Sequence, residues 1–196
     1  RSTPSNSSAA SDVYKRQVKS ITEEMSSGFD VVVSEDIVSQ KWTKLFVNLN
    51  NCIPALCGLS MQEVFSDIEI CRIALSLQRE AFEVIDKAGI RLGSLPGFDI
   101  DKARALAFMP PDKGAAIFSG IMTKLSDAPL YGSILQSIKR GRPSEIDYIN
   151  GEIVSVAQKT GISAPINSRV VDTVHSVERS GEFLSKDELK EMIKEV

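Results

Sequence analysis

Residues 144–160, with the sequence SEIDYINGEIVSVAQKT, decide the fold class of this chain. Their apolar side chains recur every three or four positions, the spacing that places them on one face of an α-helix. This stripe is formed by Ile146, Ile149, Ile153 and Val156. Ser144 is placed to cap the helix, with Asp147 completing a capping box, and Gly161 should end it. The pattern therefore predicts a long amphipathic helix packed against a core.

Helical spacing continues over most of the chain from Ile37 onward. We expect further helices at residues 37–57, 67–88, 100–108, 112–125, 130–138, 166–178 and 185–195. Pro54 should bend or break the first of these helices, and Gly89 should end the second. Only Val31–Val33 resembles a strand, within a segment (residues 18–33) that is expected to be extended or mixed. The predicted fold class is all-α.

The first 17 residues, RSTPSNSSAASDVYKRQ, are polar, rich in serine and without periodicity, which is typical of a disordered tail. They also resemble the translated adapter sequence that begins many library-derived gene fragments. We therefore expect a non-native or disordered leader (1–17), a remnant of an interdomain segment (18–36) and a helical domain (37–196). If the leader is non-native, the natural protein extends further toward its N-terminus.

Composition restricts the classes of function. The chain has 196 residues, of which 42% are apolar and 25% charged, the profile of a globular protein with a sizeable core. Its net charge of −3 argues against nucleic acid or an anionic membrane as the main partner. No apolar run approaches the ~20 residues that span a bilayer, and no secretory signal is visible. We expect a cytoplasmic protein without a membrane or nucleic-acid partner.

Several kinds of catalytic or cofactor site find no support in the residues. The three cysteines, Cys52, Cys57 and Cys71, lack a histidine at metal-ligand spacing, so we expect buried free thiols and no metal site. His175, the single histidine, is interpreted as a packing or surface residue. None of the 12 glycines forms the G-x-G turn that a dinucleotide pyrophosphate requires. By itself the chain contains no complete dinucleotide site.

A short asparagine-rich segment draws attention to a different kind of site. Lys44 and Asn48 are four residues apart on a predicted helix, so they should share one face. Asn48, Asn50 and Asn51 follow one another closely, although asparagine is a poor helix former. These asparagines either line a cleft and bind a polar ligand there, or they cap a helix that breaks before Pro54. Taken alone, Lys44 is better explained as a surface lysine whose stem lies over neighbouring apolar groups.

Three motifs, taken in order, indicate a family. Residues 42–48 read W-x-K-L-x-x-N, residues 133–151 read S-x-L-x-x-I-x-x-G-R-x-S-E-I-D-Y-I-N-G, and residues 161–167 read G-I-x-x-P-x-N. Together they resemble the C-terminal domain of the ketopantoate reductase (2-dehydropantoate 2-reductase) family, over residues 18–180. The resemblance implies an all-α domain of the 6-phosphogluconate dehydrogenase C-terminal-like type. It also implies that the cofactor-binding Rossmann domain is absent from this chain.

The resemblance further implies an NADPH-dependent reduction of a 2-oxo acid, with 2-dehydropantoate reduced to pantoate in pantothenate and coenzyme A biosynthesis. By position, Lys44 corresponds to the general acid that protonates the developing alkoxide. Glu145 corresponds to the carboxylate near the substrate hydroxyl and the lysine, and Asn48 and Ser133 to substrate-binding positions. Since NADPH would be bound mainly by the missing domain, the fragment alone is expected to be inactive.

The chain departs from the family pattern at two positions. Cys52 stands where the family often has a second asparagine, and Asn51 would serve in its place if the helix is locally distorted. Ser137 replaces a usual aspartate. The substrate therefore stays open between 2-dehydropantoate and another 2-oxo acid, and a homodimer stays open as the oligomeric state. A non-catalytic all-α interaction module on the same scaffold is the alternative from a different class.

Overall fold

The computed structural model describes residues 6–31 and 33–194. The chain divides into two compact units, the first ending at Ile37 and the second beginning at Val38. Helix α1 (Asn6–Met25) forms the described part of the first unit together with the turn that follows it. Residues 18–33, expected to be extended or mixed, are not extended throughout: 18–25 lie within α1, and a turn follows. The assignment of 1–17 as a leader stays a prediction.

The strand expected at residues 31–33 is not found. Val31 and Val33 lie in no strand, and Val32 lies outside the described residues. A β-like run of three residues needs a neighbouring strand to satisfy its backbone groups, and the described part of the chain contains only one isolated bridge, between Leu95 and Phe98. The all-α prediction is confirmed.

The second unit is a helical domain. Its elements are α2 (Ile37–Asn48), the 3₁₀ helix η1 (Leu49–Asn51), α3 (Cys52–Cys57), α4 (Met61–Phe65), α5 (Ile68–Ala88), α6 (Ile100–Ala107), α7 (Pro111–Met122), α8 (Ser133–Lys139), α9 (Ile146–Thr160), α10 (Pro165–Ser180) and α11 (Lys186–Lys194). Among the described residues, no helix is both long and apolar enough to cross a membrane.

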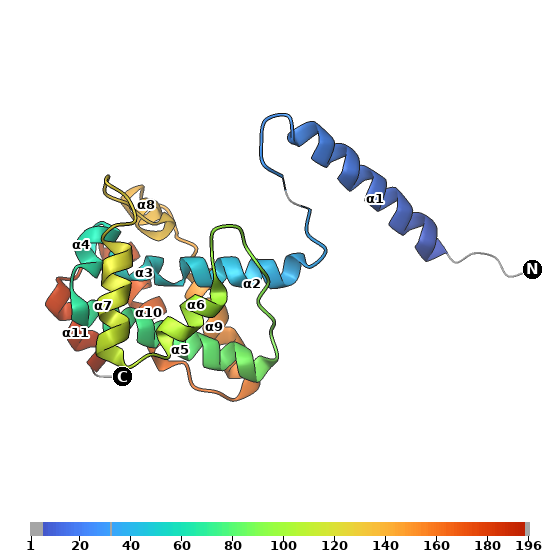
Figure 1. The fold of residues 1–196 in the computed structure, drawn as a ribbon. Helices are drawn as coiled ribbons and strands as arrows, with labels where there is room; N and C mark the ends of the chain where they lie inside the picture. The colour runs from blue at the N-terminus through green and yellow to red at the C-terminus, as the bar shows by residue number, and fades with distance from the viewer. Residues whose placement is uncertain (1–5, 32, 195–196) are drawn as a thin grey trace, which may run out of the picture. The chain divides into compact units, whose positions relative to one another are not determined.

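Helix α5 is the centre of this domain, because α6, α7, α9, α10 and α11 all pack against it (Figure 1). Asp67 caps its start by accepting hydrogen bonds from the backbone amides of Glu69 and Ile70. Gly89 ends it in the left-handed conformation, with φ of 66°. Since eleven side chains of this helix are buried, α5 supplies much of the core against which the other helices are positioned.

The segment expected as one helix over 37–57 is divided into α2, η1 and α3. The division falls at Leu49–Asn51, ahead of Pro54. Pro54 is the third residue of α3, a position in the first helical turn where no backbone N–H is needed for an intrahelical bond. The prediction that the helix breaks is thus confirmed, and the break carries the asparagine-rich segment.

The start of α9 differs from the predicted capping box. The helix begins at Ile146, with Glu145 at the N-cap position and no side-chain cap. Ser144 Oγ accepts a hydrogen bond from the Ile146 amide at 3.3 Å. Asp147 Oδ1 instead lies 2.9 Å from Nε2 of His175 on α10. The carboxylate of Asp147 therefore pairs with the histidine and does not cap α9. A capping box does occur elsewhere, between Ser60 and Glu63 at the start of α4.

Candidate functional site

The asparagine-rich segment lines a large cavity in the helical domain. Lys44 and Asn48 of α2 both lie on its wall, as the four-residue spacing predicts, and Asn50 and Asn51 of η1 follow them. The cavity has a volume of about 1070 Å³. Because η1 replaces a regular helical turn at this point, three asparagines in four positions reach one cavity.

Apolar side chains form most of the cavity wall. They come from α2, α4, α6, α7 and the loop before α6, and include Phe46, Phe65, Phe98, Leu106, Ile117, Phe118 and Ile121. Polar groups are few: beside the lysine and asparagines, the wall contains Gln78, Asp99, Lys102 and Tyr131. This composition, apolar with a few convergent polar groups, is typical of small-molecule sites.

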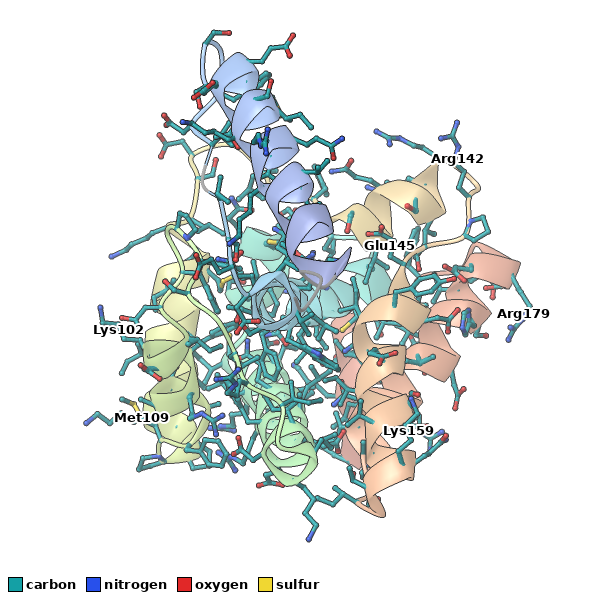
Figure 2. All side chains as sticks on the ribbon, turned by 90° about the vertical axis from the view of Figure 1, so that its right-hand side faces the viewer. Lys102, Met109, Arg142, Glu145, Lys159 and Arg179 are labelled. Atoms are coloured by element: carbon teal, nitrogen blue, oxygen red, sulfur yellow. The ribbon has the colours of Figure 1, made fainter. Side chains whose placement is uncertain are left out.

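A second, smaller cavity of about 360 Å³ lies between α2 and α9. Its wall includes Trp42, Leu45 and Asn48 from α2, and Glu145 and Tyr148 from the start of α9. Figure 2 shows Glu145 at one end of α9, on the opposite side of the view from Lys102, which lines the large cavity.

Asn48 connects the two cavities, because it lines both. Lys44 lines the large cavity and Glu145 lines the small one. The lysine and the carboxylate that were predicted to act as a pair therefore line two different cavities, which share Asn48. Asn51 Nδ2 donates to Asn48 Oδ1 at 3.5 Å. Both Lys44 and Glu145 have exposed side chains. Their predicted roles as acid and substrate-orienting carboxylate stay predictions.

Ser133 is placed differently from the other predicted residues. It is the exposed first residue of α8 and belongs to the wall of neither cavity among the described residues. Its neighbour Gly132 packs against Asn51: a Cβ on Gly132 would lie 3.0 Å from Asn51 Cγ. The residue just before the motif, Gly132, therefore supports the site by packing against Asn51, and a direct contact of Ser133 with substrate stays a prediction.

The asparagine of the Asn-Gly motif has a structural role. Asn150 is fully buried on α9, and its Nδ2 donates to the carbonyl oxygen of Leu49 at 3.3 Å and to Asn167 Oδ1 at 3.0 Å. Leu49 is the first residue of η1, where the backbone leaves regular α-helical geometry. Asn150 thus fixes the kink that presents the asparagine-rich segment to the cavity.

Glu80 completes this buried network from the central helix. Its carboxylate accepts hydrogen bonds from the backbone amides of Ile166 (3.0 Å) and Asn167 (2.8 Å) and from Asn167 Nδ2 (2.7 Å). Ile166 and Asn167 lie in the first turn of α10, whose unpaired amides and helix dipole favour an anion. A carboxylate on α5 therefore caps α10 and orients the asparagine that holds Asn150.

His175 ties the start of α9 to α10. Its Nε2 lies 2.9 Å from Asp147 Oδ1 and its Nδ1 3.0 Å from Glu178 Oε2. Hydrogen bonds to Asp147 and then to Glu178 raise the pKa of His175 above its usual value. Glu178 also accepts from the Ser144 amide at 2.8 Å, next to Glu145. His175 is a half-exposed surface residue, as predicted, and supports the segment that carries Glu145.

The cysteines offer no nucleophile. Cys52, Cys57 and Cys71 are free and buried, as predicted. Burial raises the pKa of Cys52 to about 12 and the pKa values of Cys57 and Cys71 to about 11, so all three thiols stay protonated near neutral pH. Within residues 6–31 and 33–194, no group of three or more His, Cys, Asp or Glu side chains is arranged to hold a metal ion.

The described residues do not fit a dinucleotide of the Rossmann-binding kind. That site needs a strand, a glycine-rich turn and a helix N-terminus, whereas the described part of the chain has no named strand and the sequence has no G-x-G.

The family model described as "Ketopantoate reductase PanE/ApbA C terminal" matches residues 36–178. This chain belongs to the ketopantoate reductase family. The match covers the helical domain up to the last turn of α10 and includes all three motifs, so the resemblance found in the sequence is confirmed.

Curated relatives of this ketopantoate reductase domain are named 2-dehydropantoate 2-reductase. The one from Mesorhizobium japonicum is 30% identical over 165 residues, which cover 83% of this chain and 43% of that protein. The one from Pyrococcus horikoshii is 29% identical over 142 residues, covering 72% of this chain and 40% of that protein. The chain thus spans about two fifths of the length of the curated relatives it matches.

Solved structures share the fold of the domain. D-mandelate dehydrogenase in complex with NADH has a TM-score of 0.62 and 23% identity, covering 83% of this chain and 50% of that one. A PanE/ApbA family ketopantoate reductase from Ralstonia eutropha has a TM-score of 0.60 and 22% identity, covering 78% of this chain and 45% of that one. At these identities the likeness concerns the fold.

Gln78 was not identified from the sequence as a residue of the site. It lies on α5 beside Leu77, within the apolar stripe that packs the core, and lines the large cavity. The sequence did contain one indication of this role: a polar glutamine stands among the apolar residues that form the buried face of α5. Asn50 is similar: it is buried on the same wall, and its amide atoms have no hydrogen-bond partner among the described residues.

Proposed function

We propose that this chain is the substrate-binding and proton-donating domain of an NADPH-dependent 2-oxo acid reductase, with 2-dehydropantoate as the first substrate to test. The observation that carries the proposal is the shared cavity wall of Lys44, Asn48 and Asn51. It is supported by the family membership of the chain and by relatives named 2-dehydropantoate 2-reductase.

The residues of this wall suit the chemistry of carbonyl reduction. Negative charge develops on the carbonyl oxygen as the carbon is reduced, and the ammonium group of Lys44 both stabilises that charge and donates the proton. The amides of Asn48 and Asn51 offer neutral hydrogen-bond donors to the substrate carboxylate. When NADPH is bound by a domain outside this chain, it supplies the hydride. Glu145 approaches the same substrate from the other side of Asn48.

One observation favours a second function. Lys44 and Glu145 line different cavities, an arrangement also expected of a non-catalytic interaction module that has kept the scaffold. In such a module the polar side chains would not act together on one ligand. The two functions differ in what a single substitution at Lys44 does.

The test replaces Lys44 by methionine in the full-length protein that contains this chain and measures reduction of 2-dehydropantoate with NADPH. Loss of the general acid should lower kcat by about 100-fold or more. Lys159→Met is the matched control, because Lys159 is an exposed lysine at the far end of α9 from Glu145 (Figure 2). A loss smaller than about tenfold at Lys44, or no activity in the unchanged protein, would overturn the proposal.

A further inference from the structure

Gln78 is an unpaired amide in the wall of the large cavity. It is 8% exposed, and its side chain makes no hydrogen bond to any residue that the structure describes. Its amide atoms are not among the fully enclosed polar atoms that lack a partner, so they stay accessible and can take a hydrogen-bond partner. Since Gln78 lines the cavity, a group inside the cavity can serve as that partner.

The cavity is larger than a small branched 2-oxo acid requires. Its volume of about 1070 Å³ slightly exceeds the range of roughly 300–1,000 Å³ found for sites that enclose drug-sized ligands. Lys44, Asn48 and Asn51 occupy one part of its wall, on α2 and η1, whereas Gln78 lies on α5. A ligand held by the lysine and the asparagines therefore has space left for a bulky substituent.

The cavity wall is rich in aromatic rings. Phe46, Phe65, Phe98 and Phe118 all line the cavity, and Phe65 and Phe118 meet edge to face with ring centroids 5.2 Å apart. Aromatic walls favour an aromatic ligand group through offset and edge-to-face contacts. Gln78 is uncharged and offers both a donor and an acceptor, which suits a neutral hydroxyl or amide rather than a charged group.

We propose that the large cavity accepts the side chain of an aromatic 2-oxo acid that carries a neutral polar group, and that Gln78 hydrogen-bonds this group. The proposal rests on the proposed reductase function and names its substrate class. Gln78 is then a specificity-determining residue: it selects among 2-oxo acids by the far end of their side chains, while Lys44 acts at the carbonyl.

Binding is tested first, with the chain itself. Met61, Met109 and Met122 line the cavity, whereas the other two of the five methionines, Met25 and Met192, do not. In a sample labelled at the methionine methyl groups, addition of 4-hydroxyphenylpyruvate should shift the first three NMR signals and leave the last two unchanged. Shifts at none of the cavity methionines, or equally at all five, would overturn the placement.

Selectivity is tested next, in the full-length protein. Gln78→Leu should lower kcat/KM for 4-hydroxyphenylpyruvate about tenfold and leave phenylpyruvate within about threefold, because one hydrogen bond to a neutral group is lost. Gln158→Leu, on the exposed face of α9, is the control. If Gln78→Leu does not fold, Gln78→Met replaces it, with thermal melting as the check.

The outcomes separate this inference from the function on which it rests. If 2-dehydropantoate is reduced but neither aromatic acid is, the substrate class is wrong and the reductase function stands. If Gln78→Leu affects both aromatic acids equally, the role of Gln78 is wrong. If no 2-oxo acid is reduced, the proposed function itself fails.

Discussion

Asn150 holds the backbone of Leu49, although 101 positions separate them in the chain. The contact joins Nδ2 to the Leu49 carbonyl oxygen at 3.3 Å, and both side chains are fully buried. Because no water can take over the hydrogen bond, the geometry of η1 depends on this amide. The motif on α9 therefore acts on the site by fixing the turn that carries Asn48 and Asn51.

Replacement of Asn150 by leucine should lower the free energy of unfolding by about 1–3 kcal/mol, since the Leu49 carbonyl and Asn167 Oδ1 each lose an amide donor and the carbonyl keeps only the weak Cys52 thiol. Urea unfolding of the chain measures the change. Gln158→Leu on the exposed side of the same helix should stay within about 0.5 kcal/mol of the unchanged chain. Equal losses in the two variants would show that the buried amide is not responsible.

Gly132→Ala should impair the site more than the fold. The added Cβ would lie 3.0 Å from Asn51 Cγ and 3.1 Å from its Cβ, so Asn51 must move. We expect kcat/KM for the 2-oxo acid to fall about tenfold in the full-length protein, because small displacements of substrate-binding groups are costly. Gly120→Ala in α7, where a Cβ meets nothing within 4 Å, should keep its activity and gain about 0.5–1 kcal/mol of stability. Unchanged kinetics in Gly132→Ala would exclude Asn51 from the site.

His175 should titrate above pH 6.5, because Asp147 and Glu178 raise its pKa. A raised folded-state pKa means that the stabilising contribution is fully present below the unfolded value of about 6.5 and is lost as pH rises through the folded value. As the chain has one histidine, its imidazole NMR signals give the midpoint directly. The decline in melting temperature over that pH range should be smaller in His175→Gln. A midpoint at or below 6.5 would contradict the ion-pair geometry.

The three cysteines should be unreactive in the folded chain. Burial keeps Cys52, Cys57 and Cys71 protonated, with pKa values of about 12, 11 and 11, and shields them from reagents. A thiol-specific chromogenic reagent at pH 8 should therefore react slowly with the native chain and rapidly with three equivalents in 6 M guanidinium chloride, roughly the concentration that unfolds most proteins. Fast reaction of even one thiol under native conditions would show that its burial is transient.

Much of the fold could be predicted because it depends on local patterns. The apolar stripe of α9 and the glycines that end α5 and α9 identify helices whatever surrounds them. The capping box expected at Ser144 was wrong, because Asp147 has a stronger partner in His175, which only the packing of α10 brings near. The strand expected at residues 31–33 was wrong for Val31 and Val33, since a strand needs a partner that no local pattern supplies.

The candidate site, like the fold, could be predicted from the sequence only in part. Helical spacing alone places Lys44 and Asn48 on one face, and the sequence shows that asparagines follow them. It does not show that Glu145 lines a separate cavity, or that Gln78 on α5 shares a wall with Lys44. Both facts depend on how α5 and α9 pack against α2.

By itself, the sequence determined the helical class, the family and the residues on one face of α2, because each depends on neighbours within a few positions or on an ordered set of motifs. The tertiary structure alone decided that Asn150 and Glu80 support the site, that Asn48 joins two cavities and that Gln78 lies unpaired in one of them. These are contacts between residues tens of positions apart, and only the packing of whole helices around α5 brings them within hydrogen-bonding distance or onto one cavity wall.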